Sequence, residues 1–453
     1  MSSGPLASLL LDATAEDRPV ASSGGRIIDL RRFRADVISA SQRMAAIGCR
    51  HGLVACSDAY WTTVGMFALA HNGAETVLPP NVLPDTLTAL AGAFDHIITD
   101  GAVPAGEGIL TLAPSADMAL RVALMDAENA RVTLFTSGST GTPKRISKTM
   151  RQLELEAETV ERVLGQAAPR GAWVHSTVVH QHLYGLTFRL CWPLATHRPF
   201  FGGAHQFWEP LLADLEGGAV LVTSPSHLSR LGGIPSVSPE RRPSAVLSGG
   251  APLPESAAEA TIATLGCIVR EFFGSTEAGV VASRLRDGGD QVPWQPMPGL
   301  AVTRLDDGRM HVRSPYIDDP EDEISGDLIE LDPGGGFHLR GRADRVAKIE
   351  GMRISLTEFD GRLSELNGVM QAAVVVLGDS TPYLGGVVVL DAAGVRELAE
   401  YGAFRLGRRL RRDLSRNLPL ATLPRRWRFV TTLPSGILGK VRAADLAALF
   451  DTP

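Results

Sequence analysis

The sequence predicts an α/β fold with a large N-terminal domain, whose mostly parallel sheets are flanked by helices, a small β subdomain, and a small α+β C-terminal domain. Helix-like and strand-like segments alternate through the first three quarters of the chain, which is typical of parallel sheets with ligand loops at strand ends. Near residue 300 the pattern changes to short strands broken by Asp-Gly and Gly-Gly turns, which indicates an antiparallel meander. From about residue 345 strands and helices alternate again, which indicates a separate small domain.

The individual elements follow in chain order. Residues 29–48 have helical spacing and end at a glycine, and residues 52–56 form a short apolar strand. Residues 63–80 predict a helix, a glycine stop and a strand. Buried strands are predicted at 219–225, 244–250 and 266–274, meander strands within 302–317 and 326–342, tail strands within 368–379 and 384–391, and an Arg-rich helix at 404–418.

The composition excludes several classes of protein. The 453 residues are 44% apolar and 21% charged with a net charge of −6, an ordinary globular profile without the dense basic stripe that nucleic-acid binding needs. No apolar stretch approaches the length of a membrane span, and the first residues lack the features of a secretory signal. The four cysteines have no metal-like spacing, so we expect buried, reduced thiols. A cytoplasmic protein without nucleic-acid or membrane partners is expected; the oligomeric state stays open.

Residues 136–144, TSGSTGTPK, crowd hydroxyls, glycines and one lysine behind an apolar strand. Small residues let backbone N–H groups and hydroxyls surround an anion, while a lysine neutralises its outer oxygens. A merely flexible loop would not place Pro-Lys directly after its last glycine pair. A Walker A loop is excluded, because Arg145 follows the lysine where that motif needs Ser or Thr. The predicted polyphosphate site comprises Thr136, Ser137, Gly138, Ser139, Thr140, Gly141 and Lys144.

Lysine is rare in this chain. Of 44 basic residues only four are lysines, namely Lys144, Lys148, Lys348 and Lys440. A lysine that persists where arginine is the usual cation is a candidate for a site that needs a compact, mobile ammonium group. Chance retention is the simpler explanation for Lys148, whereas the other three each lie in a glycine-rich context.

Further segments combine reactive residue types with strand ends and turns. Each residue taken singly has an ordinary structural explanation: Phe273 as a core aromatic, Arg342 as a surface ion-pair partner, His180 and His182 as satisfied structural groups. Their order along the chain is more informative than any one of them. The segments are 178–186, 247–254, 272–279, 325–355 and 433–446.

Taken in this order, the motifs are similar to those of the adenylate-forming, AMP-binding superfamily, which includes acyl-CoA synthetases, aryl-CoA ligases, luciferases and the adenylation domains of peptide synthetases. TSGSTGTPK resembles the family's phosphate loop, FGSTE its Tyr-Gly-x-Thr-Glu motif, and SGD its Thr-Gly-Asp motif. GRADRVAKIEGMRI resembles its hinge segment, and LPSGILGKVR its closing motif with the catalytic lysine. The resemblance covers about two thirds of the chain, and residues 1–130 fit only in texture.

The resemblance implies an ATP site and a catalytic group. Thr276 would hydrogen-bond the α-phosphate, and Glu277 would bind Mg²⁺, a hard cation suited to one carboxylate plus phosphates. Lys440 would bridge the substrate carboxylate, the ribose and the α-phosphate. The adenine would lie between residues 250–252 and Phe273. The implied nucleotide contacts beyond the phosphate loop are Gly250, Ala251, Pro252, Phe273, Asp327 and Arg342, the last two at the ribose.

The resemblance also implies two domains that change orientation between half-reactions. Residues 1–343 would form the large AMP-binding domain, and residues 344–453 a small mobile domain that carries Lys440. Rotation at a hinge near Asp344 would withdraw Lys440 after adenylation and present another face for thioester formation. The thiol would be that of CoA or of a carrier protein's phosphopantetheine, and the sequence leaves both open.

The sequence departs from the family pattern at several positions. Arg145 replaces the usual glycine, and would contact the triphosphate or face water. Phe273 replaces the usual tyrosine, which keeps the stacking ring but loses a hydroxyl. Glu350 stands where many relatives have a small or neutral residue beside the thiol-donor tunnel, and the large domain is short for the family. None of these changes removes a catalytic group.

The acid-binding segment indicates a substrate without an amino group. His182 and Tyr184 fall where acyl and aryl ligases carry an aromatic residue or histidine, whereas amino-acid-activating relatives carry an aspartate there. With Gly249 and Gly274 they would line a pocket. The hydrogen-bonding groups of the histidine and the tyrosine favour a hydroxylated aryl acid of the hydroxybenzoate or cinnamate type. A medium-chain fatty acyl ligase, a non-catalytic adenylate-binding homologue and an unrelated phosphotransferase remain the alternatives.

Overall fold

In the computed structural model the chain forms two compact units, one large and one small. The large unit comprises residues 1–302, 312–323 and 334–336, and the small unit residues 303–311, 324–333 and 337–453. The described residues are 4–12, 15–116, 124–137, 143–287, 292–317, 323–349, 352–378, 382–415, 418, 420–434 and 441–451.

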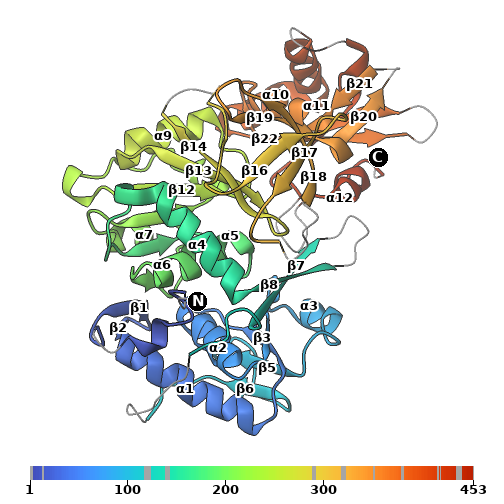
Figure 1. Ribbon diagram of the computed structural model, residues 1–453. Coiled ribbons are helices and arrows are strands. Elements are labelled where there is room, and N and C mark those ends of the chain that lie inside the picture. The colour runs from blue at the N-terminus through green and yellow to red at the C-terminus, as the bar shows by residue number, and fades with distance from the viewer. Residues whose placement is uncertain are drawn as a thin grey trace. The chain divides into compact units, whose positions relative to one another are not determined.

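The large unit contains a nine-stranded sheet whose centre is parallel (Figure 1). Strands β10, β9, β11, β12 and β13 run parallel to their neighbours, while β14 and β15 follow antiparallel at one edge and β2 at the other. The order is β15 (Gln295–Pro296), β14 (Gly279–Arg286), β13 (Val269–Ser275), β12 (Ala245–Gly249), β11 (Val220–Thr223), β9 (Val174–Ser176), β10 (Phe200–Phe201), β1 (Pro19–Ser23) and β2 (Arg26–Asp29).

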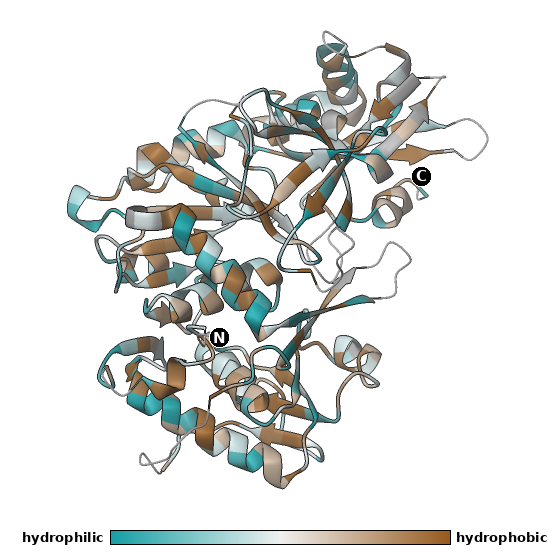
Figure 2. Ribbon diagram, in the orientation of Figure 1, coloured by the Kyte–Doolittle hydropathy of each residue, from teal (hydrophilic) through white to brown (hydrophobic). Residues whose placement is uncertain are grey.

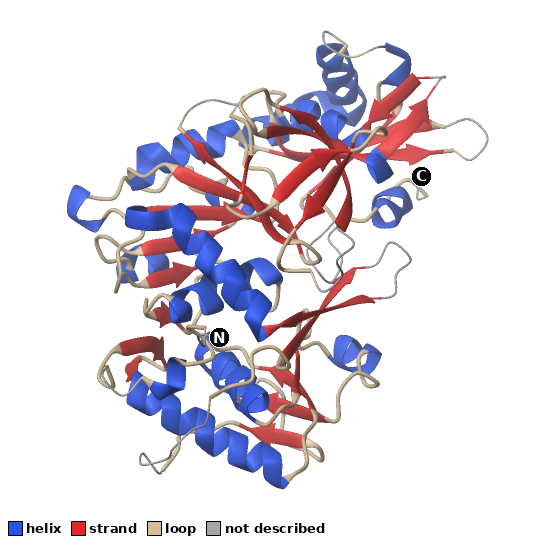
Figure 3. Cartoon of the chain, in the orientation of Figure 1, coloured by secondary structure: helices blue, strands red, loops and turns tan. Residues whose placement is uncertain are grey.

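Both faces of this sheet are buried, which explains the continuous apolar runs of its strands. Val220 and Val222 pack in one cluster with residues of α4 (Met150–Leu164) and with Phe188, while Leu221 between them packs with Trp208. Successive residues of a strand point to opposite faces, so each strand serves two layers of helices. Figures 2 and 3 show these apolar strands between helices. The remaining helices here are α5 (Leu183–Gly185), α6 (Trp192–Ala195), α7 (Trp208–Asp214), α8 (Pro225–Leu228) and α9 (Glu255–Leu265).

A six-stranded sheet forms the second layer system of the large unit. All of its strand pairs are parallel except the hairpin of β7 and β8. The order is β6 (Ile109–Thr111), β5 (His96–Thr99), β3 (His51–Ala55), β4 (Glu75–Val77), β7 (Arg131–Ser137) and β8 (Pro143–Thr149). Its helices are α1 (Leu30–Ala46), α2 (Ala59–His71) and α3 (Pro84–Ala89).

Three helices of the large unit, α1, α2 and α4, begin at a capping side chain. Asp29 and Asp58 each accept a backbone N–H in the first turn of α1 and α2, both at 2.7 Å. Thr149 and Gln152 form a reciprocal capping box at the start of α4. This box fixes the direction in which α4 leaves β8, and with it the position of every side chain on the first turns of α4.

The small unit includes most of a four-stranded sheet and an α+β tail. The sheet order is β16 (Ala301–Arg304), β17 (Arg309–Arg313), β18 (Glu323–Leu331) and β19 (Phe337–Arg342), and β18 and β19 are antiparallel. The tail packs α10 (Leu356–Ser364) and α11 (Ala392–Leu414) on a three-stranded sheet through one apolar cluster. Its other elements are β20 (Val346–Ile349), β21 (Met352–Ser355), β22 (Val369–Leu377), β23 (Tyr383–Leu390), β24 (Arg426–Val430) and α12 (Ala443–Ala448).

The predicted fold class is confirmed, with differences at element ends. The helix expected at 404–418 is the second part of α11, which begins after Gly402, where a φ of +77° and a ψ of 162° interrupt the helix, and it ends earlier than expected, at Leu414. The small unit gathers parts of the β subdomain together with the tail, whereas the sequence places a domain boundary between 343 and 344. A hinge at residue 344 therefore stays a prediction. Among the described helices, none is both long and apolar enough to cross a membrane.

Candidate functional site

The predicted phosphate loop lies in the hairpin of β7 and β8. Thr136 pairs with Lys144 and Ser137 with Pro143 in the antiparallel register, so the two strands are held together up to the loop. Gly138, Ser139, Thr140 and Gly141 lie outside the described residues, and so do the side chains of Thr136 and Ser137. The Lys144 side chain is 56% exposed, available to an anionic ligand.

Thr276 and Glu277 lie in a tight turn, Thr276–Ala278, between β13 and β14. Both are half-buried. Glycines on either side permit the turn: a Cβ on Gly274 would meet the carbonyl oxygen of Gly279 at 2.2 Å, and Gly279 has a φ of +77°. Gly274 therefore has a backbone role in addition to the pocket role that the sequence suggests.

The phosphate-loop lysine and the turn carboxylate lie together. Lys144 Nζ is 3.1 Å from Glu277 Oε1. Burial raises the pKa of Glu323, at the start of β18, and so does the negative charge of Glu277, while the neighbouring lysines lower it. A carboxylate such as that of Glu277 is a ligand that a hard cation prefers, and an ammonium group such as that of Lys144 binds phosphate oxygens. The residues present therefore fit Mg²⁺ with a polyphosphate, and Glu323 is a second carboxylate that the motifs did not indicate.

Two neighbours of the loop differ from the sequence prediction. Arg145 forms an ion pair with Glu75 of β4 and its side chain is 50% exposed, so its guanidinium has a protein partner that the sequence did not indicate. Lys148, for which chance retention seemed sufficient, is only 2% exposed and donates to the backbone oxygens of Glu277 and Tyr316. Chance retention does not explain a buried ammonium with two acceptors.

The predicted adenine contacts follow two adjacent strands. Gly249 of β12 is in register with Phe272 of β13, so the segments after the two strands leave the same edge of the sheet. Gly250 has a φ of +88° and turns the chain there. Phe273 is half-buried, with its ring 5.6 Å from that of Trp294. Ala251 and Pro252 are exposed beside this edge.

The predicted acid pocket brings Tyr184 against Gly249. A Cβ on Gly249 would meet the Tyr184 ring at 2.6 Å, so only glycine allows this contact. The Tyr184 ring packs 4.8 Å from Phe188, and its hydroxyl is buried with no hydrogen-bond partner among the described residues. Phe188 lies in a π-helical turn, Leu186–Cys191, a local irregularity common near functional sites. His182 precedes α5 and is half-buried.

His180 is a structural group, as its ordinary explanation predicted. Its Nε2 lies 2.8 Å from the hydroxyl of Thr62 and 3.2 Å from the carbonyl oxygen of Cys56. Burial, followed by the charge of Arg189, lowers the pKa of His180 to about 3, so the ring is neutral. A neutral, hydrogen-bonded histidine at this position joins α2 to the segment that leads to α5.

The predicted ribose contacts lie together in the small unit. Asp327 of β18 pairs with Arg342 of β19 across the sheet, and Arg342 Nη1 is 3.6 Å from Asp327 Oδ1. Ser325 donates to the Asp327 carboxylate at 2.5 Å, which fixes its orientation. The Arg342 side chain is 45% exposed, so it is open to a ligand.

The side chains of three predicted positions lie outside the described part of the structure. Lys440 and Glu350 lie outside the described residues. Asp344 lies in a single 3₁₀ turn, Ala343–Arg345, between β19 and β20, and its side chain is not described. Their roles therefore stay predictions from sequence.

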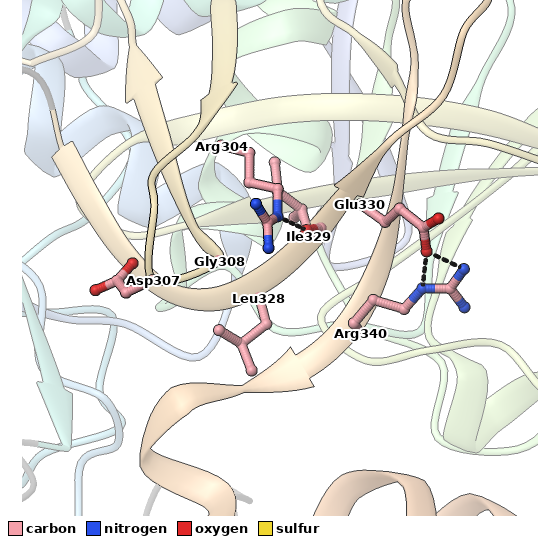
Figure 4. Close-up of a pocket in the computed structure, with 7 residues that line it drawn as sticks. All are labelled: Arg304, Asp307, Gly308, Leu328, Ile329, Glu330 and Arg340. Atoms are coloured by element: carbon pink, nitrogen blue, oxygen red, sulfur yellow. Dashed lines mark hydrogen bonds and ion pairs between the residues drawn. The ribbon is translucent and has the colours of Figure 1, made fainter.

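A pocket on the small unit is distinct from the motif residues. It is lined by Arg304, Asp307, Gly308, Leu328, Ile329, Glu330 and Arg340 (Figure 4). Its charged groups have partners: Arg340 Nε donates to Glu330 at 2.8 Å, and Arg304 Nε to the carbonyl oxygen of Ile329 at 3.0 Å. None of the predicted site residues lines it, so the motif residues remain the candidate site.

The cysteines are free, and three of the four are buried, as predicted. Ligand atoms of Cys49, Asp95 and His96 nevertheless lie within 4.8 Å of one another. Burial, and then the Asp95 charge, raises the pKa of the Cys49 thiol to about 12, while Asp95 accepts from His96 Nδ1 at 2.9 Å and from two backbone N–H groups. This cluster satisfies itself, so it does not call for a metal ion.

Comparison with known proteins identifies a family. The family model of the AMP-binding enzyme matches residues 66–316. A 4-coumarate–CoA ligase of Cereibacter sphaeroides is 26% identical over 314 residues, which are 69% of this chain and 70% of that protein. A phosphinothricin tripeptide synthetase of Streptomyces viridochromogenes is 28% identical over 377 residues, covering 70% of this chain and 31% of that protein. ATP-bound MatB from Rhodopseudomonas palustris has the same fold, with a TM-score of 0.81, 20% identity and coverage of 100% and 99% of the two chains.

Proposed function

Because the chain belongs to the AMP-binding enzyme family, we propose that it activates a carboxylic acid with ATP and transfers the acyl group to a thiol. The contact between Lys144 and Glu277, at 3.1 Å, is the observation that carries this proposal. It joins the phosphate-loop hairpin to the turn that holds the second motif, although 133 residues separate them in sequence. The proposed compartment is the cytoplasm.

The first half-reaction is adenylation. A substrate carboxylate oxygen attacks the α-phosphorus of ATP, and the bond to the β-phosphate breaks to release pyrophosphate. Negative charge grows on the phosphoryl oxygens and on the leaving group, so positioned donors lower the barrier. Lys144 and the loop residues would hold the outer phosphates, Thr276 would donate to the α-phosphate, and Glu277 would hold Mg²⁺. The ion would supply charge neutralisation between phosphates.

The second half-reaction transfers the acyl group from AMP to a thiol. Lys440 would assist adenylation and then be withdrawn as residues 344–453 rotate at Asp344. Asp327 and Arg342 would hold the ribose in both steps. CoA is favoured as acceptor by the likeness to 4-coumarate–CoA ligase, and a carrier-protein phosphopantetheine by the likeness to a peptide synthetase.

The proposed substrate is an aryl acid with a polar ring substituent and no α-amino group. The buried Tyr184 hydroxyl, which has no partner among the described residues, would lose a hydrogen bond unless the substrate supplied one. The aromatic neighbours Phe188 and Phe272, 4.5 Å apart, suit an aryl ring. A hydroxybenzoate or hydroxycinnamate combines both features.

The test is pyrophosphate release from ATP across a panel of hydroxyaryl, alkyl and amino acids. We expect acid-dependent pyrophosphate release with AMP, fastest with hydroxyaryl acids. Preference for medium-chain alkyl acids would replace the aryl assignment while keeping the chemistry. Release of ADP and phosphate would indicate a phosphotransferase, and nucleotide binding without turnover of any acid would indicate a non-catalytic homologue.

A further inference from the structure

We propose that Lys148 and Glu156 are positioning residues that hold the Thr276–Ala278 turn, and so fix Glu277 relative to Lys144. This inference rests on the proposed function, because it assigns a purpose to a turn that would hold the metal and the α-phosphate. Lys148 is the last residue but one of β8, and Glu156 lies on the second turn of α4. We call these two residues the clamp.

Lys148 holds the turn from its centre. Its ammonium donates to the backbone oxygen of Glu277 and, at 2.5 Å, to that of Tyr316. Burying an ammonium group to 2% exposure costs free energy unless its N–H groups donate hydrogen bonds. The two backbone acceptors therefore have a role in keeping Lys148 at this position. Side chains two apart along a strand share a face, so Lys144 and Lys148 project from β8 in the same direction. One strand therefore contacts Glu277 twice, at its carboxylate and at its carbonyl.

Glu156 holds the end of the turn. Its Oε1 accepts from the backbone N–H of Val280 at 2.9 Å, immediately after Gly279. A Cβ on Gly279 would meet Tyr316 at 2.6 Å and Glu156 at 3.3 Å, so the chain passes closely between them. Burial raises the pKa of Glu156 to about 7, and the Lys148 charge opposes this rise, which indicates that the two clamp residues are close enough to interact.

The middle of the turn is held as well. Ala278 N–H donates to the Ser275 hydroxyl at 3.0 Å, and its carbonyl accepts from the Ser314 hydroxyl at 3.0 Å. Side chains thus fix backbone atoms of residues 277, 278 and 280. The Glu277 backbone is thereby held where its carboxylate lies 3.1 Å from Lys144 Nζ.

The alternative is that the clamp only stabilises the fold. Both roles predict a lower unfolding temperature for Lys148→Met, which keeps the aliphatic chain but removes the ammonium. Only a positioning role predicts that Lys148→Met lowers activity by displacing Glu277, so that the variant has no further effect once Glu277 is replaced. The matched control is Arg131→Met on the neighbouring strand β7, because Arg131 donates to the Ser147 hydroxyl at 3.5 Å and has no proposed role in the site.

The experiment is a double-variant cycle on the full chain with Lys148→Met, Glu277→Gln and both together. Initial rates of pyrophosphate release would be measured against Mg²⁺ concentration, and ATP affinity by calorimetry with and without Mg²⁺. We expect Lys148→Met to lower the rate by about 10², as a small misplacement of a reacting group does, and to raise the Mg²⁺ concentration for half-maximal rate. The Mg²⁺-dependent gain in ATP affinity should shrink, the double variant should be no worse than Glu277→Gln, and Arg131→Met should change neither the rate nor this gain.

Two results would contradict the positioning role. One is a double variant whose rate loss is the sum of the two single losses in free energy. The other is a lower rate for Lys148→Met with an unchanged Mg²⁺ dependence and an unchanged Mg²⁺-dependent gain in ATP affinity. If Lys148→Met does not fold, Lys148→Arg keeps the charge but not the compact head, and the same Mg²⁺ shift is expected of it. Absence of any acid-dependent pyrophosphate release by the unmodified protein would instead refute the proposed function. The calorimetric comparison would then still decide whether Lys148 fixes Glu277.

Discussion

The turn that carries Thr276 and Glu277 and the pair formed by Asp327 and Arg342 are built differently. The turn is fixed at successive backbone atoms by buried groups, of which Lys148 is only 2% exposed. The pair stands on a hairpin of the small unit, and the Arg342 side chain is 45% exposed. Under the proposed roles, phosphate chemistry needs donors that are placed before reaction, whereas ribose contacts need only bind, and the two constructions would match these demands.

The largest expected effect concerns Lys440. Lys440→Ala should lower acid-dependent pyrophosphate release by about 10²–10³, the usual loss for one transition-state donor. Thioester formation from preformed acyl-adenylate should be nearly unchanged, because Lys440 would then be withdrawn. Both rates can be measured on one preparation, with Arg412→Ala, at a side chain that is 72% exposed, as a control for loss of a cation. An equal loss in both half-reactions would show that the small unit acts in one orientation.

The second prediction concerns the motion itself. Proline fixes φ and lacks an N–H, so Asp344→Pro should lock one orientation if the backbone turns at this residue. We expect adenylation to persist and thioester yield to fall by at least about tenfold, the scale of a changed closure step. The measurement is pyrophosphate and thioester yield on the same folded variant. Full retention of both activities would remove residue 344 as the hinge.

The third prediction tests the rigid construction of the turn. Gly279→Ala meets both a positive φ and the Tyr316 ring, and should lower the free energy of unfolding by about 1–3 kcal/mol beyond the backbone strain alone. Gly299→Ala is the matched control, since Gly299 has a φ of +89° with nothing within 4 Å of a new Cβ. Chemical denaturation compares them. Similar losses would mean that the turn can yield, contrary to the clamp.

Much of this could be predicted from sequence, and the reasons for the rest are physical. Alternation of apolar segments predicted the parallel sheets, and strand-end glycines predicted tight turns, which the structure shows as close contacts at Gly249 and Gly274. Lys148 and Glu156 were missed because their partners are backbone atoms 129 and 124 residues away, which leave no signature in residue type. Arg145 was uncertain for a similar reason, because Glu75 lies 70 residues before it.

A smaller effect is expected at the exposed pair. Arg342→Met removes a 3.6 Å ion pair whose Arg342 side chain is 45% exposed, and exposed pairs contribute about 0.2–1 kcal/mol. The KM for ATP should therefore rise less than about tenfold, with kcat nearly unchanged. Steady-state kinetics at saturating acid give both values. A large fall in kcat would instead show that Arg342 acts in the chemical step, as proposed for Thr276 and Glu277.

The smallest effect is a pH dependence from Glu156. Its pKa is raised from 4.5 to about 7, so the native state holds a proton that the unfolded state has lost between these values. This group's contribution to stability is present below pH 4.5 and is lost as the pH rises toward 7. The unfolding free energy of Glu156→Gln relative to the unmodified protein should therefore increase over this range. A constant difference would contradict a buried, proton-binding Glu156.

The most direct measurement of the central proposal follows one oxygen atom. A hydroxyaryl acid labelled with ¹⁸O in its carboxylate is incubated with ATP, Mg²⁺ and CoA or a phosphopantetheine thiol, and the products are examined by mass spectrometry. If the carboxylate attacks the α-phosphorus and the thiol later displaces AMP, each AMP carries one labelled oxygen and the pyrophosphate carries none. Label in phosphate together with ADP, or AMP without label, would contradict an acyl-adenylate.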